Sequence, residues 1–211
     1  MSFIPSKHSK ISSGLRIYLV RHAESLNNIM CHDHPGEYET IRSHDPVLSE
    51  TGHEQAKQLA RYIKQHEHLS EICEGKGYLV HCSAMHRSLL TSQYLQRELE
   101  INPEIWVEIH EVKGCRELNK AYPGLRRSEI EAEFPGFIIP EGCTENGWFL
   151  RDDAESEEEA WERAGRVWSR LKAMSREDKY QGKSIIIITH GLFLDFLVGR
   201  VCGRTMKGGK I

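Results

Sequence analysis

The sequence predicts an α/β protein: a three-layer α/β/α sandwich with a mostly parallel central sheet and an inserted lid region. Short apolar stretches alternate with amphipathic helical patterns along the chain, and this alternation is typical of layered α/β domains. Residues 185–188 are consecutive isoleucines, which indicates a strand covered by helices on both faces. Residues 113–150 hold several prolines and glycines and are too long for an ordinary connection, so they are predicted to form the lid.

The N-terminal part of the chain predicts a tail, a strand and a loop. Residues 1–14 are rich in serine and lysine and are expected to be a flexible tail, which leaves residues 15–211 as one domain. The apolar residues 17–20 predict a short buried strand. The polar residues 30–46 that follow predict a loop.

A helix is predicted over residues 48–66. Its apolar side chains recur at helical spacing, and they are Ala56, Leu59, Ala60 and Ile63. Ser49 and Thr51 can each cap the first turn, and Thr51 with Glu54 fits a capping box.

The rest of the chain repeats the alternation of strand and helix. Strands are predicted over residues 77–84, 104–112 and 184–189, and helices over residues 85–100, 155–174 and 191–201. Acidic residues fill the first turn of the helix at 155–174, as the helix dipole prefers. Its apolar side chains form one stripe, in which Trp161 and Trp168 are expected to pack in the core.

Composition and charge restrict the possible partners. The chain has 211 residues and a formal net charge of -3. It therefore lacks the basic excess of a nucleic-acid-binding domain, and we expect no nucleic-acid partner. No apolar run approaches the roughly 20 residues of a membrane-spanning helix, and the N-terminus lacks the apolar core of a signal peptide. We therefore expect a cytoplasmic protein without a membrane partner, whose oligomeric state the sequence does not predict.

The six cysteines are scattered and form no C-x-x-C pair, which favours free thiols in a reducing compartment. One local group, Cys31 with His32 and His34, has the chemistry of metal ligands, but no second cluster at zinc-finger spacing accompanies it. A solvated loop is the preferred interpretation of this group. Cys82 is expected to be a small buried residue.

Cationic side chains follow three of the predicted strands. Arg21 and His22 end the first strand, Arg87 follows the second, and His190 follows the isoleucine strand. Ligands of open α/β sheets bind outside the carboxyl ends of the strands, so we expect these side chains to meet at one edge. Guanidinium groups match the geometry of phosphate oxygens. The sequence therefore predicts a phosphate site at this edge.

Six motifs in order resemble those of the histidine phosphatase superfamily, the phosphoglycerate-mutase-like proteins. These motifs are "RHAES" with Asn28, "LSETGHEQA", "CSAMHRSLLTS" (Ser83, Arg87, Thr91), "CREL" (Glu117), "AESEEEAWERAG" (Glu155, Ser156, Arg163) and "ITHG" (His190). The resemblance extends from about Arg16 to Val201. Ala23 stands where the family commonly has glycine. The family usually adds a strand beyond the position of Ile211, so the resemblance implies a missing edge strand, a trimmed chain or a short variant.

The resemblance implies two-step phosphoryl transfer through a phosphohistidine on His22. Glu117 is expected to be the general acid and base, with Glu111 as a rival. The resemblance implies that four residues hold the phosphoryl oxygens: Arg21, Asn28, Arg87 and His190, the last as a charged clamp. No cofactor or metal is expected, because side chains supply the positive charge.

Physical chemistry adds two expectations about His22 itself. Two neighbouring arginines should lower its pKa and keep it neutral, as a nucleophile requires. Its second ring nitrogen should donate to a backbone carbonyl, which would fix the tautomer.

Three activities are compatible with these residues. A metal-independent phosphomonoester hydrolase of the histidine acid phosphatase type, acting on a small phosphorylated metabolite or a phosphoprotein, is the leading interpretation. A phosphoglycerate mutase is second, because the run "ELNKAYPG" departs from the Glu-Arg-His-Tyr-Gly run of family mutases. An inactive phosphate-binding module is third. Three cations of the predicted lid either attract an anionic substrate or form a solvated face: Lys120, Arg126 and Arg127.

Overall fold

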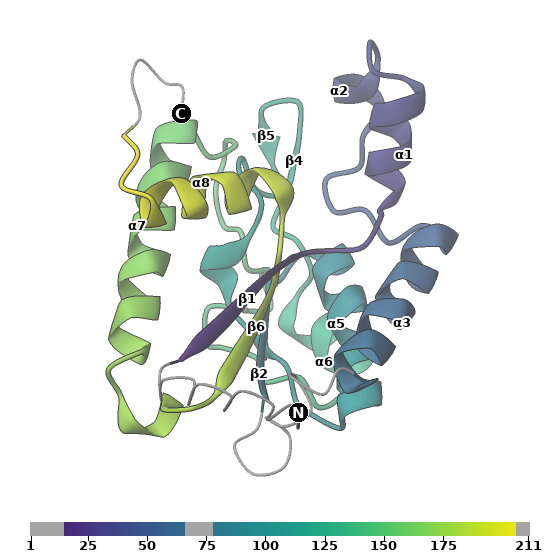
Figure 1. Ribbon diagram of the computed structural model, residues 1–211. Helices are drawn as coiled ribbons and strands as arrows, with labels where there is room; N and C mark the ends of the chain where they lie inside the picture. Colours follow the sequence, from purple (N-terminus) through teal and green to yellow (C-terminus); the bar gives the residue numbers. More distant parts are fainter. Residues whose placement is uncertain (1–14, 66–77, 206–211) are drawn as a thin grey trace, which may run out of the picture.

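The computed structural model describes residues 15–65 and 78–205. The predicted tail, residues 1–14, lies outside the described residues. Figure 1 shows a central sheet with helices on both of its faces, so the predicted three-layer α/β/α arrangement is confirmed.

Four parallel strands form the central sheet of the described chain, in the order β1-β6-β2-β3. They are β1 (Arg16–Arg21), β2 (Tyr78–Cys82), β3 (Glu104–Ile105) and β6 (Ser184–Thr189). Strand β6 lies between β1 and β2 and is buried along its whole length, which accounts for its run of isoleucines. The register brings the carboxyl ends together, because Arg21 pairs with Thr189 and Cys82 pairs with Ile188.

Helices cover both faces of this sheet and define two hydrophobic cores. Helices α3 (Glu50–Gln65) and α5 (His86–Leu99) lie on one face, and α7 (Glu157–Met174) and α8 (Gly191–Val201) lie on the other (Figure 1). Ile186 and Ile188 belong to the α3–α5 core, whereas Ile185 and Ile187 belong to the α7–α8 core. Alternate residues of one strand therefore supply both cores. The short 3-10 helix η2 (Asp178–Tyr180) connects α7 to β6.

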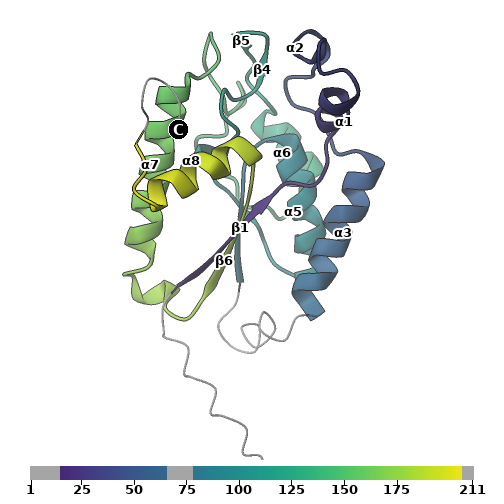
Figure 2. The same cartoon turned by 45° about the horizontal axis from the view of Figure 1, so that its top comes forward.

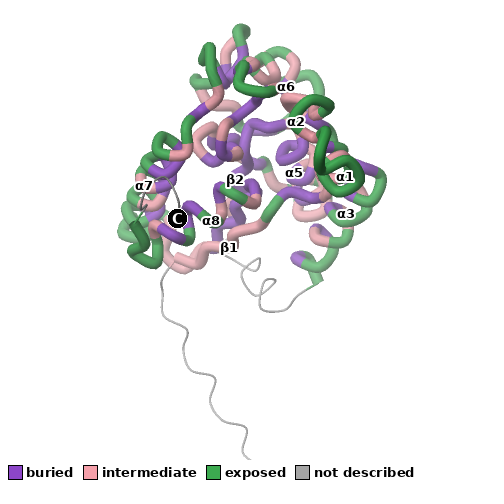
Figure 3. Tube along the Cα trace, turned by 90° about the horizontal axis from the view of Figure 1, so that it is seen from above, coloured by how far each residue is buried: buried purple, intermediate pink, exposed green. Residues whose placement is uncertain are grey.

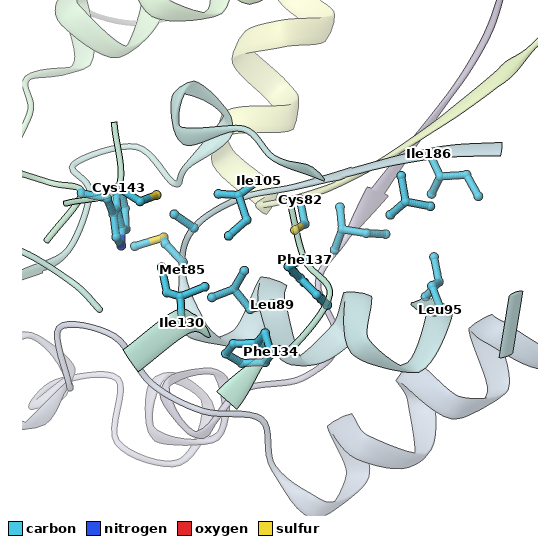
Figure 4. Packing of buried hydrophobic residues seen from close by; sticks show 14 of the residues in the cluster. Cys82, Met85, Leu89, Leu95, Ile105, Ile130, Phe134, Phe137, Cys143 and Ile186 are labelled. Atoms are coloured by element: carbon cyan, nitrogen blue, oxygen red, sulfur yellow. The ribbon is translucent and has the colours of Figure 1, made fainter. Parts of the chain in front are cut away.

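Residues 113–150 contain the small hairpin β4 (Arg116–Glu117) and β5 (Lys120–Ala121) and the helix α6 (Arg127–Glu133). Much of this stretch belongs to the body of the domain. Figure 4 shows Ile130, Phe134, Phe137 and Cys143 in one hydrophobic cluster with Met85, Leu89 and Leu95 of the α5 region. A lid role for these residues stays a prediction.

The predicted loop at residues 30–46 is partly wrong. This region contains the end of α1 (Leu26–Asp33) and the short helix α2 (Tyr38–Ile41). Asn27 is the single buried residue of α1, and α2 has none, so no apolar pattern indicated a helix. Figure 3 shows both helices largely exposed, and Figure 2 shows them standing beyond the sheet, across from the β4–β5 hairpin.

Two finer predictions are also wrong. The strand predicted at residues 104–112 is only two residues long and continues as the 3-10 helix η1 (Val107–Ile109). Here Thr189 Oγ1 donates to the Ile109 carbonyl at 2.6 Å, which draws the chain toward the end of β6 instead of along β2. Ser49 is the predicted cap that forms, since α3 begins at Glu50 and Ser49 Oγ accepts from the Gly52 amide at 2.9 Å, so the capping box at Thr51 does not form.

Candidate active site

The two histidines of the strand ends lie side by side. The His22 amide donates to the Thr189 carbonyl at 2.8 Å, which extends the β1–β6 pairing by one residue. The centroids of the His22 and His190 rings are 5.0 Å apart. Arg87, in the first turn of α5, donates from Nε to His22 Nε2 at 3.1 Å. The predicted convergence of His22, His190 and Arg87 at one edge of the sheet is therefore confirmed.

His22 is held in one orientation with one nitrogen left unprotonated. Its Nδ1 donates to the Ala23 carbonyl at 2.7 Å, as predicted, so Nε2 carries the lone pair that accepts from Arg87. Burial first, and then the charges of Arg87 and Arg21, lower the pKa of His22 to about 3. The sequence attributed this lowering to the arginines, but burial contributes more. Thr91 supports the geometry, since its Oγ1 accepts from the Ala23 amide at 3.1 Å.

His190 is fully buried, and neither of its ring nitrogens has a hydrogen-bond partner within the described chain. Burial lowers the pKa of His190 well below its usual value, and Arg87 and His22 lower it further. The groups around His190 therefore favour a neutral imidazole ring, whereas the sequence led us to expect a charged one. A dianion in contact with the ring is what would favour the imidazolium.

The guanidinium group of Arg87 is buried, whereas Arg21 is exposed. The Arg87 side chain is 7% exposed, and its Nη1 is buried with no hydrogen-bond partner among the described residues, 3.7 Å from Asp45 Oδ1. Arg21 is exposed at the end of β1. A Cβ atom on Gly191 would lie 3.4 Å from Arg21 Nε, so the Arg21 side chain passes close to the start of α8.

Asn28 has a structural role that the sequence did not indicate. Its Oδ1 accepts from the Ser25 amide and from Ser25 Oγ, both at 3.0 Å, which fixes the first turn of α1. Because the oxygen is used in this way, the amide nitrogen is the group left to donate to an anion. Asn28 lines the same cavity as Arg21 and His22, as predicted.

The structure does not bring Glu117 into this cavity. Glu117 Oε1 instead lies 2.9 Å from His44 Nδ1, and its side chain is 41% exposed. Hydrogen bonds from His44 and Tyr122 lower the pKa of Glu117. The Glu117 carboxylate therefore lies outside the lining of this cavity, and its role as general acid stays a prediction.

The rival carboxylate, Glu111, does line the cavity with His22. Its Oε1 accepts from the Val112 amide at 2.9 Å and from the Phe193 amide, in the first turn of α8, at 3.0 Å. Both bonds use the same oxygen, so Oε2 is left to exchange a proton. The sequence put Glu117 first because of its place in "CREL", whereas the 3-10 turn η1 directs Glu111 to the strand ends.

The cavity at the strand ends has a volume of about 220 Å³. Its charged lining residues are Arg21, Arg42, Arg87, Glu111, Lys113 and Arg116, beside His22 and Tyr38. A second hollow of about 340 Å³ reaches His22 from the side of Glu24 and Gln55. A wider hollow of about 780 Å³ lies along α7 and α8 and has none of these groups in its lining.

Sequence analysis missed three cations of this cavity: Arg42, Lys113 and Arg116. They lie outside the strand ends, in segments whose course the sequence does not define. The lid cations that it named are not in the lining. Arg126 pairs instead with Glu129, Arg127 pairs with Glu131, and the Lys120 ammonium lies over the Tyr122 ring.

No group of three or more metal-ligating side chains occurs within residues 15–65 and 78–205, so the Cys31 cluster does not form a metal site. Cys31 is exposed, at the end of α1, and Cys82 is buried as predicted. Burial raises the pKa of the Cys82 thiol to about 12, and all the described cysteines are free thiols. No helix in the described part of the chain is long and apolar enough to cross a membrane.

A layered α/β fold that gathers histidine and arginine around one anion cavity defines a class of phosphate-handling protein. The chain belongs to the histidine phosphatase superfamily (branch 1), whose model matches residues 17–210. No curated protein matches the chain significantly.

Three solved structures share the fold at low sequence identity. The ecdysone phosphate phosphatase of Bombyx mori, solved with tungstate, is 19% identical with a TM-score of 0.57, and the match covers 91% of this chain and 80% of that one. The α-ribazole phosphatase of Shigella flexneri is 20% identical with a TM-score of 0.55, covering 90% and 81%. A mycobacterial glucosyl-3-phosphoglycerate phosphatase is 18% identical with a TM-score of 0.53, covering 91% and 81%.

Proposed function

We propose that this chain hydrolyses phosphomonoesters through a phosphohistidine on His22, with Glu111 in place of Glu117 as the proton donor and acceptor. The observation that carries the proposal is the state of His22. Its Nδ1 is fixed by the Ala23 carbonyl, and its Nε2 is unprotonated 3.1 Å from a guanidinium that can bind a phosphoryl oxygen. A neutral imidazole with an unprotonated nitrogen is the form that attacks phosphorus.

In the first step, the Nε2 lone pair forms a bond to phosphorus while the ester P–O bond breaks. The departing oxygen takes a proton from Glu111. In the second step, water attacks phosphorus, Glu111 takes a proton from that water, and the P–N bond breaks to release inorganic phosphate and neutral His22.

Positive charge from side chains stabilises the transferring phosphoryl group in this scheme. Arg87 and Arg21 would bind its oxygens, and the Asn28 amide and His190 would add donors. Approach of the dianion would raise the pKa of His190, so the ring would become charged when the phosphoryl group arrives. We expect turnover to persist after treatment with a chelator.

Small phosphorylated metabolites are the substrates that we favour over phosphoproteins. The cavity of about 220 Å³ and the second hollow of about 340 Å³ that reaches His22 have the size of small-molecule sites. The similar structures are also named for small substrates, an ecdysone phosphate and a ribazole phosphate. Both observations support a compact phosphate ester.

The test is trapping of the phosphoenzyme. Incubation with radiolabelled phosphomonoester and rapid denaturation should leave label on His22 that is labile to acid and stable to alkali, together with release of inorganic phosphate. Label on another residue would contradict the nucleophile. Transfer of label to a second phosphorylated metabolite without phosphate release would indicate a mutase, and binding with neither reaction would indicate a phosphate-binding module.

A further inference from the structure

The cavity around His22 carries more positive charge than one phosphoryl group uses. Its lining contains the cations Arg21, Arg42, Arg87, Lys113 and Arg116, and Glu111 is its one carboxylate. Two of these cations form an ion pair with a carboxylate outside the lining. The Arg116 guanidinium binds both oxygens of Glu39, at 2.7 and 3.0 Å, and Arg87 lies 3.7 Å from Asp45.

Arg42 and Lys113 have no such partner. No carboxylate of the described chain lies within 4.0 Å of either ammonium or guanidinium group. Arg42 Nε is buried and makes no hydrogen bond to any described residue, and its guanidinium carbon lies 5.4 Å from the centre of the Tyr38 ring. Both cations lie near enough to Glu39 to lower its pKa, but neither forms an ion pair with it, and an anionic ligand would offset the cost of their partial burial.

The cations divide into two groups within the cavity. Arg87 and Arg21 are the charges that lower the pKa of His22, after burial. Arg116, by hydrogen bonding and charge, and then Arg42 and Lys113 lower the pKa of Glu39 instead. Arg42 is the residue after α2, Arg116 lies in β4 and Lys113 precedes β4 by three residues, so the second group comes from segments other than the strand ends that carry His22 and His190. Two segments supply it: Tyr38 and Arg42 belong to the start and the end of α2, and Lys113 and Arg116 lie just before and in β4. Figure 2 shows α2 across from the β4–β5 hairpin.

Lys113 is held in place by its backbone. Its φ of 72° lies in the left-handed region, and the Lys113 carbonyl accepts from the Glu155 amide at 3.4 Å. On the other side of His22, the second hollow contains Glu24, whose carboxylate would repel an anion. The cavity with Arg42 and Lys113 therefore carries the larger excess of positive charge, which favours an anionic tail on that side of His22.

We infer that the natural substrate is a phosphomonoester that carries a second anionic group, a carboxylate or a further phosphate, bound by Arg42 and Lys113. The inference rests on the phosphatase activity proposed above. The phosphoryl group would lie against His22 and Arg87, and the second group would lie between α2 and the start of the β4–β5 hairpin. Uncharged phosphate esters would be poorer substrates.

Calorimetric binding of substrate-like phosphonates tests this without turnover. The probes are ω-carboxyalkyl phosphonates of increasing length, alkane bisphosphonates, and alkyl phosphonates of the same lengths with an uncharged end. At the matching length, the second charge should tighten binding by about tenfold or more, because hydrogen bonds to charged groups are stronger than those between neutral groups. The carboxylate and bisphosphonate series identify which anion fits. Equal affinity for charged and uncharged ends at every length would overturn the inference.

Variants locate the site. Arg42→Gln and Lys113→Gln should each remove most of the preference for a charged end, while the affinity for the uncharged alkyl phosphonate changes less than about threefold. Arg61→Gln, on the exposed face of α3, is the matched control and should keep the preference. If Arg42→Gln fails to fold, Lys113→Gln and the wild-type affinity ratio still decide. A preference that survives both substitutions would overturn the assignment of these residues.

Failure of this inference can be separated from failure of the proposed function. Absence of phosphate release from phenyl phosphate, with no phosphoenzyme, would reject the phosphatase. Release of phosphate from phenyl phosphate together with equal phosphonate affinities would keep the phosphatase and reject only the dianionic substrate.

Discussion

Two regions of the molecule place ionisable groups in one cavity, and they hold them in different ways. At the strand ends, His22 and His190 are positioned by backbone pairing of adjacent parallel strands. In the irregular stretch after β3, Glu111 is positioned by side-chain bonds to the amides of Val112 and Phe193. The first region follows from sheet geometry, whereas the second depends on a 3-10 turn that ends a strand early. Strand pairing therefore fixes the positions of His22 and His190. The position of Glu111 depends instead on the local conformation of an irregular segment.

Substitution at the strand ends should have the largest effect. His22→Ala removes the nucleophile, and we expect turnover of any phosphomonoester to fall by roughly 10⁴-fold or more, with loss of the labelled phosphoenzyme. The measurement is phosphate release under single-turnover conditions. Binding of an alkyl phosphonate should persist, which shows that the variant is folded. Ordinary activity in this variant would refute the role of the strand-end region.

A matched pair of substitutions distinguishes the two carboxylates of the irregular stretch. Glu111→Gln keeps an acceptor for the Phe193 amide but cannot donate a proton as an acid does, so turnover of an alkyl phosphate should fall by about 10²–10⁴-fold. With p-nitrophenyl phosphate, whose leaving group needs no proton, the loss in the phosphorylation step should be much smaller.

Glu117→Gln is the control for this pair, because it makes the same chemical change outside the cavity. It should alter turnover less than about threefold with either substrate, since surface ion pairs contribute little. The opposite ranking of the two variants would restore Glu117 as the acid.

The sequence predicted the strand-end region well for a physical reason. An apolar run followed by arginine or histidine defines both the strand and the residue that emerges at its carboxyl end, and parallel pairing then brings those ends together. His22, Arg87 and His190 could be placed in this way.

The other wall of the cavity could not be placed from the sequence. Arg42 and Lys113 lie in segments without periodic apolar residues, and their positions depend on long-range pairs such as Arg116 with Glu39 and His44 with Glu117. The choice between Glu117 and Glu111 is open to the same difficulty, because proximity in sequence to a motif does not fix the course of an irregular chain.

The strand-end region should also make the fold sensitive to acid. The pKa of His22 is 6.5 in the unfolded chain and about 3 in the fold, so between these values the unfolded state binds a proton that the native state does not. Stability is therefore fully present above about pH 6.5 and falls as the pH falls, by about 2 kcal/mol near pH 5. The lowered pKa of His190 acts in the same direction.

Urea unfolding near pH 7 and near pH 5 measures this effect. In His22→Asn, the loss of unfolding free energy between the two conditions should be about 2 kcal/mol smaller than in the wild type, because asparagine does not titrate. An identical loss in both proteins would show that the buried imidazole does not control the response to acid.

The smallest effect we predict concerns Asp45, which lies in an irregular segment and contacts Arg87. Its Oδ1 accepts from the His86 amide at 2.9 Å and lies 3.7 Å from Arg87 Nη1, so it fixes Arg87 from behind. Asp45→Asn keeps the acceptor and removes the charge. Looser placement of Arg87 should lower kcat by about tenfold or less, while loss of the negative charge should tighten inhibition by inorganic phosphate. A purely structural role would weaken both, and Asp33→Asn, exposed on α1, should change neither.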